Sequence, residues 1–174
     1  MILELQPRQP PQPPPSRKLK LSGGVQGTRQ TLQIMAKLVR QGRENPAVRA
    51  QALQLVKPLS QKDYLGEAKK IHAFVRDHVR YVRDPKGVEP LHTAEQMLLQ
   101  RQGDCDDKTV LVAAMLETIG HPTRIVAVGF AQGYCHVFPE VQIKGTWYTV
   151  ETTEPWQFGQ SLKKTPILRM VETV

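Results

Sequence analysis

The feature that most constrains this fold is a strongly apolar helix followed directly by strands. The helix is predicted to begin at Asp104 or Cys105 and to end at Gly120. Because apolar residues dominate it, we expect it to be buried. Three strand-like runs follow, at 124–130, 136–143 and 146–152. A buried central helix against an antiparallel sheet predicts an α+β fold.

The last two runs predict a hairpin with a definite register. If Lys144 and Gly145 are the two central turn residues, the numbers of facing positions sum to 289. His136 and Glu151 then lie on one face of the sheet as diagonal neighbours. The other face is expected to belong to the core, and it carries Val137, Val141, Tyr148 and Val150.

The first turn of the central helix carries a candidate nucleophile. Cys105 faces the positive end of the helix dipole, which favours thiolate, but the neighbouring aspartates oppose that effect. A thiol nucleophile needs a base, and the base needs a third group that fixes its tautomer. His136 and Glu151 suit those two roles. We therefore predict a catalytic set of Cys105, His136 and Glu151.

Two further side chains are candidates for the cleft around this set. The backbone amide of Cys105 suits one oxyanion donor, and Tyr81 is the candidate for the second. Trp147 shares the His136 face of the hairpin. It is expected either to wall a substrate cleft or to cover the edge of the core.

The other histidines and the second cysteine predict no further chemistry. His72 and His78 are six residues apart on a predicted helix, which is not the spacing of a metal pair. His92 and His121 lack any comparable context, and we interpret all four as non-catalytic. Cys135 is expected to point to the other face of its strand. Two cysteines make neither a disulfide framework nor a four-ligand zinc site, so we expect no metal ion and no organic cofactor.

The chain divides by composition into four predicted parts. The first is a proline-rich basic arm, which we expect to be extended and flexible. The second is a basic helical extension, the third is the candidate catalytic core, and the fourth is a tail of ambiguous structure. Their boundaries are 1–27, 28–60, 61–160 and 161–174.

Four helices are expected before the central one. Thr28 is predicted to cap the first, which ends near Gln41, and Asn45-Pro46 opens the second. A third spans about 63–80. Thr93 opens a short fourth helix with a capping box.

The net charge of +8 belongs entirely to the first third of the chain. Residues 1–60 hold ten Lys or Arg against two acidic residues, whereas residues 61–174 are balanced. This predicts either a solvated surface or an electrostatic dock for an acidic protein or assembly partner. No aromatic residue precedes Tyr64, so base stacking is not expected there, and nucleic acid is not predicted as the main partner.

The sequence predicts no association with a membrane. It contains no apolar run long enough to span one, and its first residues lack the apolar core of a signal peptide. We therefore expect a cytoplasmic protein, with a place in a virion as the alternative.

Several segments, taken in order, carry a resemblance to a known family. They are Gly103-Asp104-Cys105-Asp106-Asp107 with its helix, Arg124–Gly129, His136–Val141, Gly145–Glu151 and the upstream Val79-Arg80-Tyr81. Together they resemble the core of the transglutaminase-like superfamily, in particular its bacterial and phage members, over about residues 63–155. The resemblance implies a papain-like α+β fold with the central helix packed against an antiparallel sheet.

The resemblance also implies a chemistry. Members of this family use a Cys-His-Asp triad and a thioester acyl-enzyme, so Cys105 matches the nucleophile and His136 the base. Glu151 stands where the family usually has aspartate, which keeps a carboxylate and adds one methylene. Phe138 stands where tryptophan is common.

Two functions are therefore expected as alternatives. The first is a thiol-dependent enzyme acting on amide bonds of a protein or peptide substrate. It would be a peptidase or amidase, which the resemblance favours, or a transglutaminase-like acyltransferase. The second is a weak or inactive module that acts in binding or assembly, for example in a phage particle, with residues 1–60 as the docking segment. Replacing Cys105 would abolish the first function and preserve the second.

Overall fold

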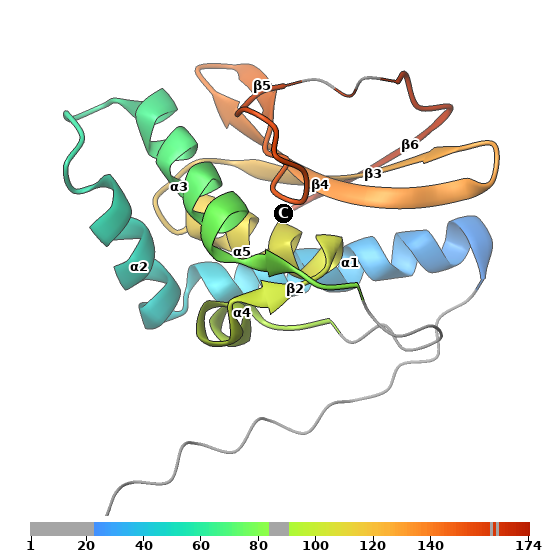
Figure 1. Cartoon of the computed structure of the whole chain (residues 1–174), viewed down its shortest axis with the longest axis horizontal. Coiled ribbons are helices and arrows are strands. Elements are labelled where there is room, and N and C mark those ends of the chain that lie inside the picture. Colours follow the sequence, from blue (N-terminus) through green and yellow to red (C-terminus); the bar gives the residue numbers. More distant parts are fainter. Residues whose placement is uncertain (1–22, 84–90, 161, 163) are drawn as a thin grey trace, which may run out of the picture.

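The computed structural model describes residues 23–83, 91–160, 162 and 164–174. In chain order the elements are α1 (Gly24–Arg43), α2 (Pro46–Val56), α3 (Tyr64–His78), β1 (Arg80–Tyr81), α4 (Ala94–Gln100), β2 (Gln102–Gly103), α5 (Cys105–Glu117), β3 (Thr123–Phe130), β4 (Gly133–Ile143), β5 (Thr146–Thr149) and β6 (Leu168–Thr173). The helices lie together beneath one face of the sheet (Figure 1). This is the mixed helix and antiparallel-sheet fold that the sequence predicts.

The helix α5 is the centre of the core. Every residue from Asp107 to Leu116 is buried. The helix α1 packs closely on it because Gly42 has no side chain: a Cβ at Gly42 would stand 2.7 Å from the Cβ of Ala114. Buried residues of α1, α2, α3 and the inner sheet face join α5 in one hydrophobic cluster. The basic helices α1 and α2 therefore share a core with the candidate catalytic helix.

The main sheet has four antiparallel strands in the order β5-β4-β3-β6. The edge strand β6 comes from the tail, which the sequence left ambiguous. Along β6 only Met170 is buried, so the apolar alternation that identifies a strand is weak there. A second, two-stranded sheet pairs β1 with β2 in parallel, just before α5 begins.

The predicted hairpin register is confirmed. Glu140 faces Thr149 and Val141 faces Tyr148. The turn residues Lys144 and Gly145 both have positive φ, at 49° and 83°, as a two-residue hairpin turn requires. The predicted inner face is also confirmed, since Val137, Val141 and Val150 are buried and Tyr148 packs against the core. The strand β5 ends at Thr149, so Glu151 lies just beyond it.

A bulge interrupts β3 and β4 beside His136. Val128 faces His136, but Gly129 faces Tyr134, which leaves Cys135 as an extra residue on β4. A bulge of this kind resets the alternation of faces and re-aims nearby side chains. Parity arguments therefore hold on the hairpin side of His136 and fail at Cys135.

The predicted caps at Asn45 and Thr93 are confirmed, and the one at Thr28 is wrong. Asn45 caps α2, and Thr93 forms the expected capping box at α4. Asp63, for which no cap was predicted, caps α3. Thr28 is not a cap, because α1 already begins at Gly24 and the Thr28 hydroxyl donates to the Gly24 carbonyl at 3.3 Å. The packing of α1 on the core starts at the buried Gly27, and this tertiary contact overrides the weak helix propensity of the glycines. Of the predicted arm, 1–27, residues 24–27 belong to α1, Gly23 is the N-cap of α1, and residues 1–22 lie outside the described residues.

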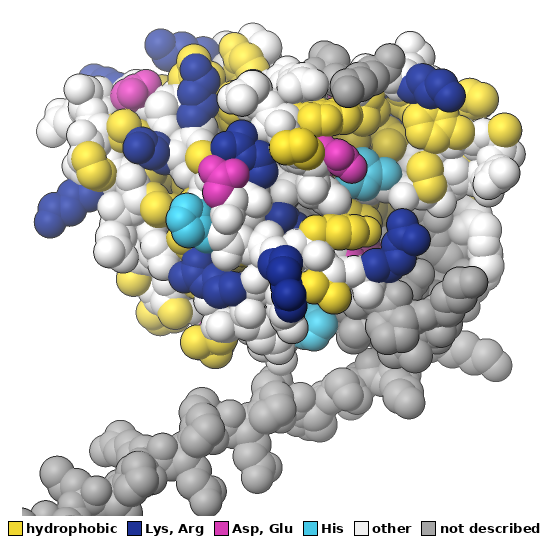
Figure 2. Space-filling model, viewed as in Figure 1, with side chains coloured by type: hydrophobic (Ala, Val, Ile, Leu, Met, Phe, Trp, Pro, Cys, Tyr) yellow, Lys and Arg dark blue, Asp and Glu magenta, His cyan; other side chains and the backbone are white. Residues whose placement is uncertain are grey.

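The surface carries no single dominant patch in the view of Figure 2. Lys and Arg side chains are dispersed over this face among apolar and uncharged ones. No helix among the described residues is long and apolar enough to cross a membrane.

Candidate active site

Two residues fix where α5 begins. The Asp104 carboxylate caps the helix by accepting the backbone N–H groups of Asp106 and Asp107 at 3.0 and 3.3 Å. Gly103 has no room for a side chain, since a Cβ there would stand 2.7 Å from Oδ2 of Asp107. This local geometry places Cys105 at the first position of α5.

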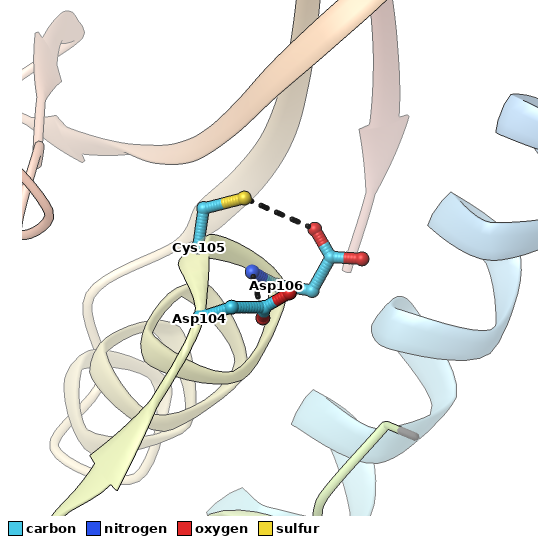
Figure 3. A group of neighbouring side chains, drawn as sticks. All are labelled: Asp104, Cys105 and Asp106. Atoms are coloured by element: carbon cyan, nitrogen blue, oxygen red, sulfur yellow. Dashed lines mark hydrogen bonds between the residues drawn. The ribbon is translucent and has the colours of Figure 1, made fainter. Parts of the chain in front are cut away.

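The thiol of Cys105 lies among acids. Its S–H donates to Oδ1 of Asp106 at 3.5 Å (Figure 3). Burial raises the pKa of the Cys105 thiol far above its usual range, and the charges of Asp106 and Asp104 raise it further. The aspartates and burial therefore oppose the helix dipole and favour the neutral thiol.

His136 and Glu151 form a hydrogen-bonded pair, as their shared face of the hairpin predicts. Nε2 of His136 donates to Oε2 of Glu151. Oε1 of Glu151 accepts the backbone N–H groups of Thr153 and Glu154 at 2.5 and 3.3 Å. Both carboxylate oxygens are therefore held, and the imidazole tautomer is set by the Nε2 contact.

The two partners stabilise one another's charged forms. Burial lowers the pKa of His136, but the hydrogen bond and the charge of Glu151 outweigh burial and raise the pKa overall. Burial raises the pKa of Glu151, but its bonds to His136 and to two backbone amides bring the pKa below its usual value. This half of the site thus favours an imidazolium–carboxylate pair.

One cavity of about 250 Å³ borders both the Cys105 thiol side of the site and His136. Its lining includes Cys105 and Asp106 at the start of α5 and His136 on β4. Thr28 and Thr31 of α1 also line it. The N-terminal helix, which the sequence set apart as an extension, therefore contributes to the surroundings of the thiol.

The predicted cleft side chains lie elsewhere. Among the described residues, neither Tyr81 nor Trp147 lines this cavity. Tyr81 is exposed on β1 and pairs with Gly103 of β2, while Trp147 lies beneath the guanidinium of Arg124, 4.2 Å from the ring centroid. Cys135, which was expected to point to the other face of its strand, does line the cavity. The bulge beside it explains the difference.

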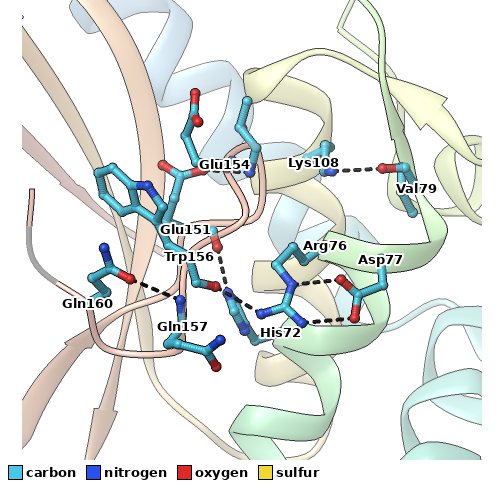
Figure 4. A network of polar contacts seen from close by, with 11 residues as sticks. His72, Arg76, Asp77, Val79, Lys108, Glu151, Glu154, Trp156, Gln157 and Gln160 are labelled. Carbon is cyan, nitrogen blue, oxygen red and sulfur yellow. Dashed lines mark hydrogen bonds and ion pairs between the residues drawn. The ribbon is translucent and has the colours of Figure 1, made fainter.

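Two buried polar residues on helices, His72 and Lys108, lie near the loop that carries Glu151 (Figure 4). Nε2 of His72 on α3 donates to the Glu151 backbone carbonyl at 2.5 Å. Lys108 on α5 donates from Nζ to the Val79 carbonyl at 2.7 Å. Burial lowers the pKa of Lys108 to about 8, and the charge of Glu151 opposes that shift. A lysine on an otherwise apolar helix was a usable sequence signal, whereas nothing in the sequence distinguished His72 from the exposed histidines.

Two other histidines are engaged in links between elements. Asp107 is fully buried and accepts both the backbone N–H and the Nδ1–H of His92 at 2.9 Å. Asp107 therefore anchors the segment before α4. His121 donates to Glu67 of α3 at 2.7 Å.

Within the described ranges, one group of three potential metal ligands is found. Ligand atoms of Asp104, Cys105 and Asp106 lie within 4.8 Å of one another. Asp104 is the helix cap and Asp106 accepts the thiol hydrogen bond, so the start of α5 accounts for the grouping.

Comparison with known protein families identifies the family of this chain. A profile of the transglutaminase-like superfamily matches residues 51–152, which is more than half of the chain. The chain therefore belongs to the transglutaminase-like superfamily. The matched range includes Cys105, His136 and Glu151 and leaves out α1.

Several solved structures have a similar fold, and two of them are described as proteases. LapG of Legionella pneumophila, calcium-bound, has 15% sequence identity and a TM-score of 0.53, over 78% of this chain and 83% of LapG. A candidate protease of Parabacteroides distasonis has 14% identity and a TM-score of 0.58, over 82% of this chain and 29% of that one. A candidate cysteine protease of Cytophaga hutchinsonii has 14% identity and a TM-score of 0.52, over 74% and 46%.

These similarities establish the fold. This chain spans less than half the length of the Cytophaga and Parabacteroides proteins. No curated protein matches it significantly.

Proposed function

We propose that this chain is a thiol-dependent enzyme that transfers acyl groups from amide bonds, chiefly by hydrolysis of a protein or peptide substrate. The observation that carries the proposal is the cavity that both Cys105 and His136 line, with His136 hydrogen-bonded to Glu151. Membership of the transglutaminase-like superfamily supports it, as does the description of similar folds as cysteine proteases.

The first half of the reaction forms a thioester. Because Glu151 engages Nε2 of His136, Nδ1 is the ring nitrogen that takes the proton from the Cys105 thiol. The sulfur attacks the amide carbonyl, and the oxyanion forms near the N-terminus of α5, where the Cys105 backbone N–H has no acceptor within the helix. His136 then gives its proton to the leaving amine, and the carbon–nitrogen bond breaks.

The second half releases the acyl group. Water takes the place of the amine, His136 removes its proton, and the hydroxide attacks the thioester. The carbon–sulfur bond breaks and the proton returns to sulfur. If an amine replaces water, the same steps give transamidation. Glu151 keeps the imidazole oriented and stabilises its charged form throughout.

The first test is cleavage of a mixed synthetic peptide library, with new termini identified by mass spectrometry. Wild-type protein is expected to produce new termini that Cys105→Ala does not. Cys135→Ala is the matched control and is expected to keep the cleavage: Cys135 also lines the cavity, but its exposed thiol is not the proposed nucleophile. Equal cleavage by wild type and Cys105→Ala would contradict the proposal.

A second candidate function rests on the state of the thiol. The Cys105 S–H donates to Asp106, and its pKa is raised, which suits an unreactive cysteine. We therefore retain the alternative of a binding or assembly module, possessing the fold without the reaction. Such a module would bind an acidic partner through residues 1–60.

Binding to a fluorescent polyglutamate peptide tests this alternative. If the chain is a binding module, we expect the peptide to bind Cys105→Ala as well as wild type, and binding to weaken steadily as the salt concentration rises. Association that is absent at low salt, or insensitive to salt, would remove the role given to the basic segment.

A further inference from the structure

The segment after β5 is fastened to one face of α3. Nε2 of His72 lies 2.5 Å from the Glu151 carbonyl oxygen. One turn further along α3, Arg76 donates from a terminal guanidinium nitrogen to the Trp156 carbonyl at 2.9 Å. Figure 4 shows both side chains reaching from α3 toward the same loop. The loop that carries Glu151 thus has two separate attachments to α3.

His72 is well suited to hold a backbone group. It is 1% exposed, and the Phe158 ring packs edge-on against it with centroids 5.9 Å apart. A carbonyl oxygen can only accept, so Nε2 carries the proton. Burial lowers the pKa of His72, which keeps the ring neutral near neutral pH. A neutral, fixed imidazole holds the carbonyl without adding a charge beside the Glu151 carboxylate.

Glu151 depends on such a hold because it has left the sheet. The last sheet-like bond before it runs from the Val150 N–H to the Pro139 carbonyl at 2.9 Å. Glutamate carries one more rotatable bond than aspartate, so its carboxylate reaches a fixed point only if the backbone is fixed. The Thr153 and Glu154 backbone N–H groups donate to the Glu151 carboxylate, but they belong to the same loop and so do not fix it relative to the helices. The His72 bond ties the Glu151 backbone to a helix.

We propose that His72 is a positioning residue: by holding the Glu151 backbone carbonyl, it keeps the Glu151 carboxylate in contact with His136. This role rests on the proposed function only in that His136 is taken as the catalytic base. The contact itself can be tested without any substrate.

The charged groups around both rings are defined. The charges that act on His136 are those of Glu151, which is also its hydrogen-bond partner, Glu154 and Asp106. The charges that act on His72 are those of Arg76, Asp77 and Glu151. A change in the titration of His136 on replacing His72 would therefore report on movement of Glu151, since burial lowers the pKa of His72 and disfavours a charge on that ring.

The experiment is an NMR pH titration of the His136 ring in wild type, His72→Leu and His72→Gln. His72→Leu removes the donor, and His72→Gln keeps a side-chain N–H. Glu151→Gln sets the scale for complete loss of the carboxylate. We expect the pKa of His136 in His72→Leu to move at least halfway from the wild-type value to the Glu151→Gln value, and to recover in His72→Gln. An unchanged His136 titration in folded His72→Leu would overturn the proposal.

Arg76→Leu is the matched control. It removes the second attachment of the same loop to the same helix, five residues beyond Glu151, and is expected to leave the His136 titration at the wild-type value. If Arg76→Leu moved it as far as His72→Leu does, the effect would be general loosening of the loop, and the specific role of His72 would be rejected.

A measurement on wild type keeps the proposal testable if His72→Leu does not fold. The nitrogen chemical shifts of His72 are expected to show a neutral ring with the proton on Nε2, protected from exchange with solvent. A proton on Nδ1, or rapid exchange at Nε2, would overturn the proposal.

Activity separates this inference from the proposed function. If the enzyme is active, His72→Leu is expected to lower kcat by about tenfold with little change in KM, since loss of an orienting partner typically costs about that much. Loss of substrate binding alone, seen as a raised KM at unchanged kcat, would contradict positioning. A shifted His136 titration in a protein without any peptidase activity would uphold the contact and reject only the proposed function.

Discussion

The two parts of the candidate site, the His136–Glu151 pair and the Cys105 thiol, have surroundings that favour opposite charge states. His136 and Glu151 form a pair in which each group favours the charge of the other. Cys105 is buried beside Asp104 and Asp106, which favour its neutral form. In the proposed reaction the base, His136, is thus oriented in advance, while the thiol would gain its charge only by giving a proton to His136. A helix N-terminus does not by itself make a cysteine reactive, because near neighbours dominate the local field.

The largest expected effect comes from removing the base. His136→Ala is expected to lower kcat/KM on a peptide found in the library by about 10³-fold or more, since the neutral thiol then has no proton acceptor. His78→Ala is the control, because His78 is exposed at the end of α3 and stacks on Phe74. Equal losses in the two variants would show that the two halves do not work together.

Replacing the orienting carboxylate is expected to have the next largest effect and to change the pH dependence. The base works only when His136 has lost its proton, so activity rises with pH through the His136 pKa. Because Glu151 raises that pKa above 6.5, the rise lies above that pH in wild type. Glu151→Gln is expected to lower kcat/KM by about 10²-fold and to move the rise to lower pH. The pH–rate profiles of the two proteins measure this, and a rise at the same pH in both would contradict the pairing.

A substitution at the start of α5 tests how tightly the segment that carries Cys105 is packed. Gly103→Ala places a Cβ 2.6–2.8 Å from atoms of Met97 and Asp107, so we expect the free energy of unfolding to fall by about 1–3 kcal/mol. Urea denaturation measures it. Gly23→Ala, where a Cβ meets nothing within 4 Å, is the control and should change stability little. A Gly103→Ala protein as stable as wild type would mean that the start of α5 is loosely packed.

The smallest effect should come from one charge beside the thiol. Asp106→Asn removes a negative neighbour of Cys105, which lowers the pKa of the thiol and increases the thiolate fraction at a given pH. We expect alkylation of Cys105 by iodoacetamide at neutral pH to be slow in wild type and several-fold faster, up to about tenfold, in Asp106→Asn. Glu95→Gln, on the exposed side of α4, controls for net charge. An unchanged rate in Asp106→Asn would show that burial alone keeps the thiol neutral.

The hairpin could be predicted from the sequence because its information is local. The Lys144-Gly145 turn fixed the register, and the register placed His136 and Glu151 on one face. The cap of α2 and the capping box of α4 were likewise readable from a few adjacent residues. Patterns of adjacent residues therefore predict a turn, a helix cap or the pairing of two neighbouring strands.

The remaining features depend on contacts between distant segments. The bulge that brings Cys135 to the cavity arises from the pairing of β3 with β4, and no turn residue in the sequence predicts it. The strand β6 is stabilised by β3, some forty residues earlier in the chain, and not by its own alternation. The contacts of α1 with the cavity and of His72 with Glu151 link segments about 80 residues apart. Sequence patterns alone could not supply these distances.

The most direct test of the account is acylation by p-nitrophenyl acetate, with the modified cysteine located by mass spectrometry. Both thiols of the chain are free, and both line the cavity, so each acetylated cysteine has to be located separately. The account predicts that an acetyl thioester forms on Cys105 in wild type and is lost in His136→Ala. Acetylation of Cys105 that is absent in wild type, or that persists without His136, would contradict the claim that the two halves of the site act as one.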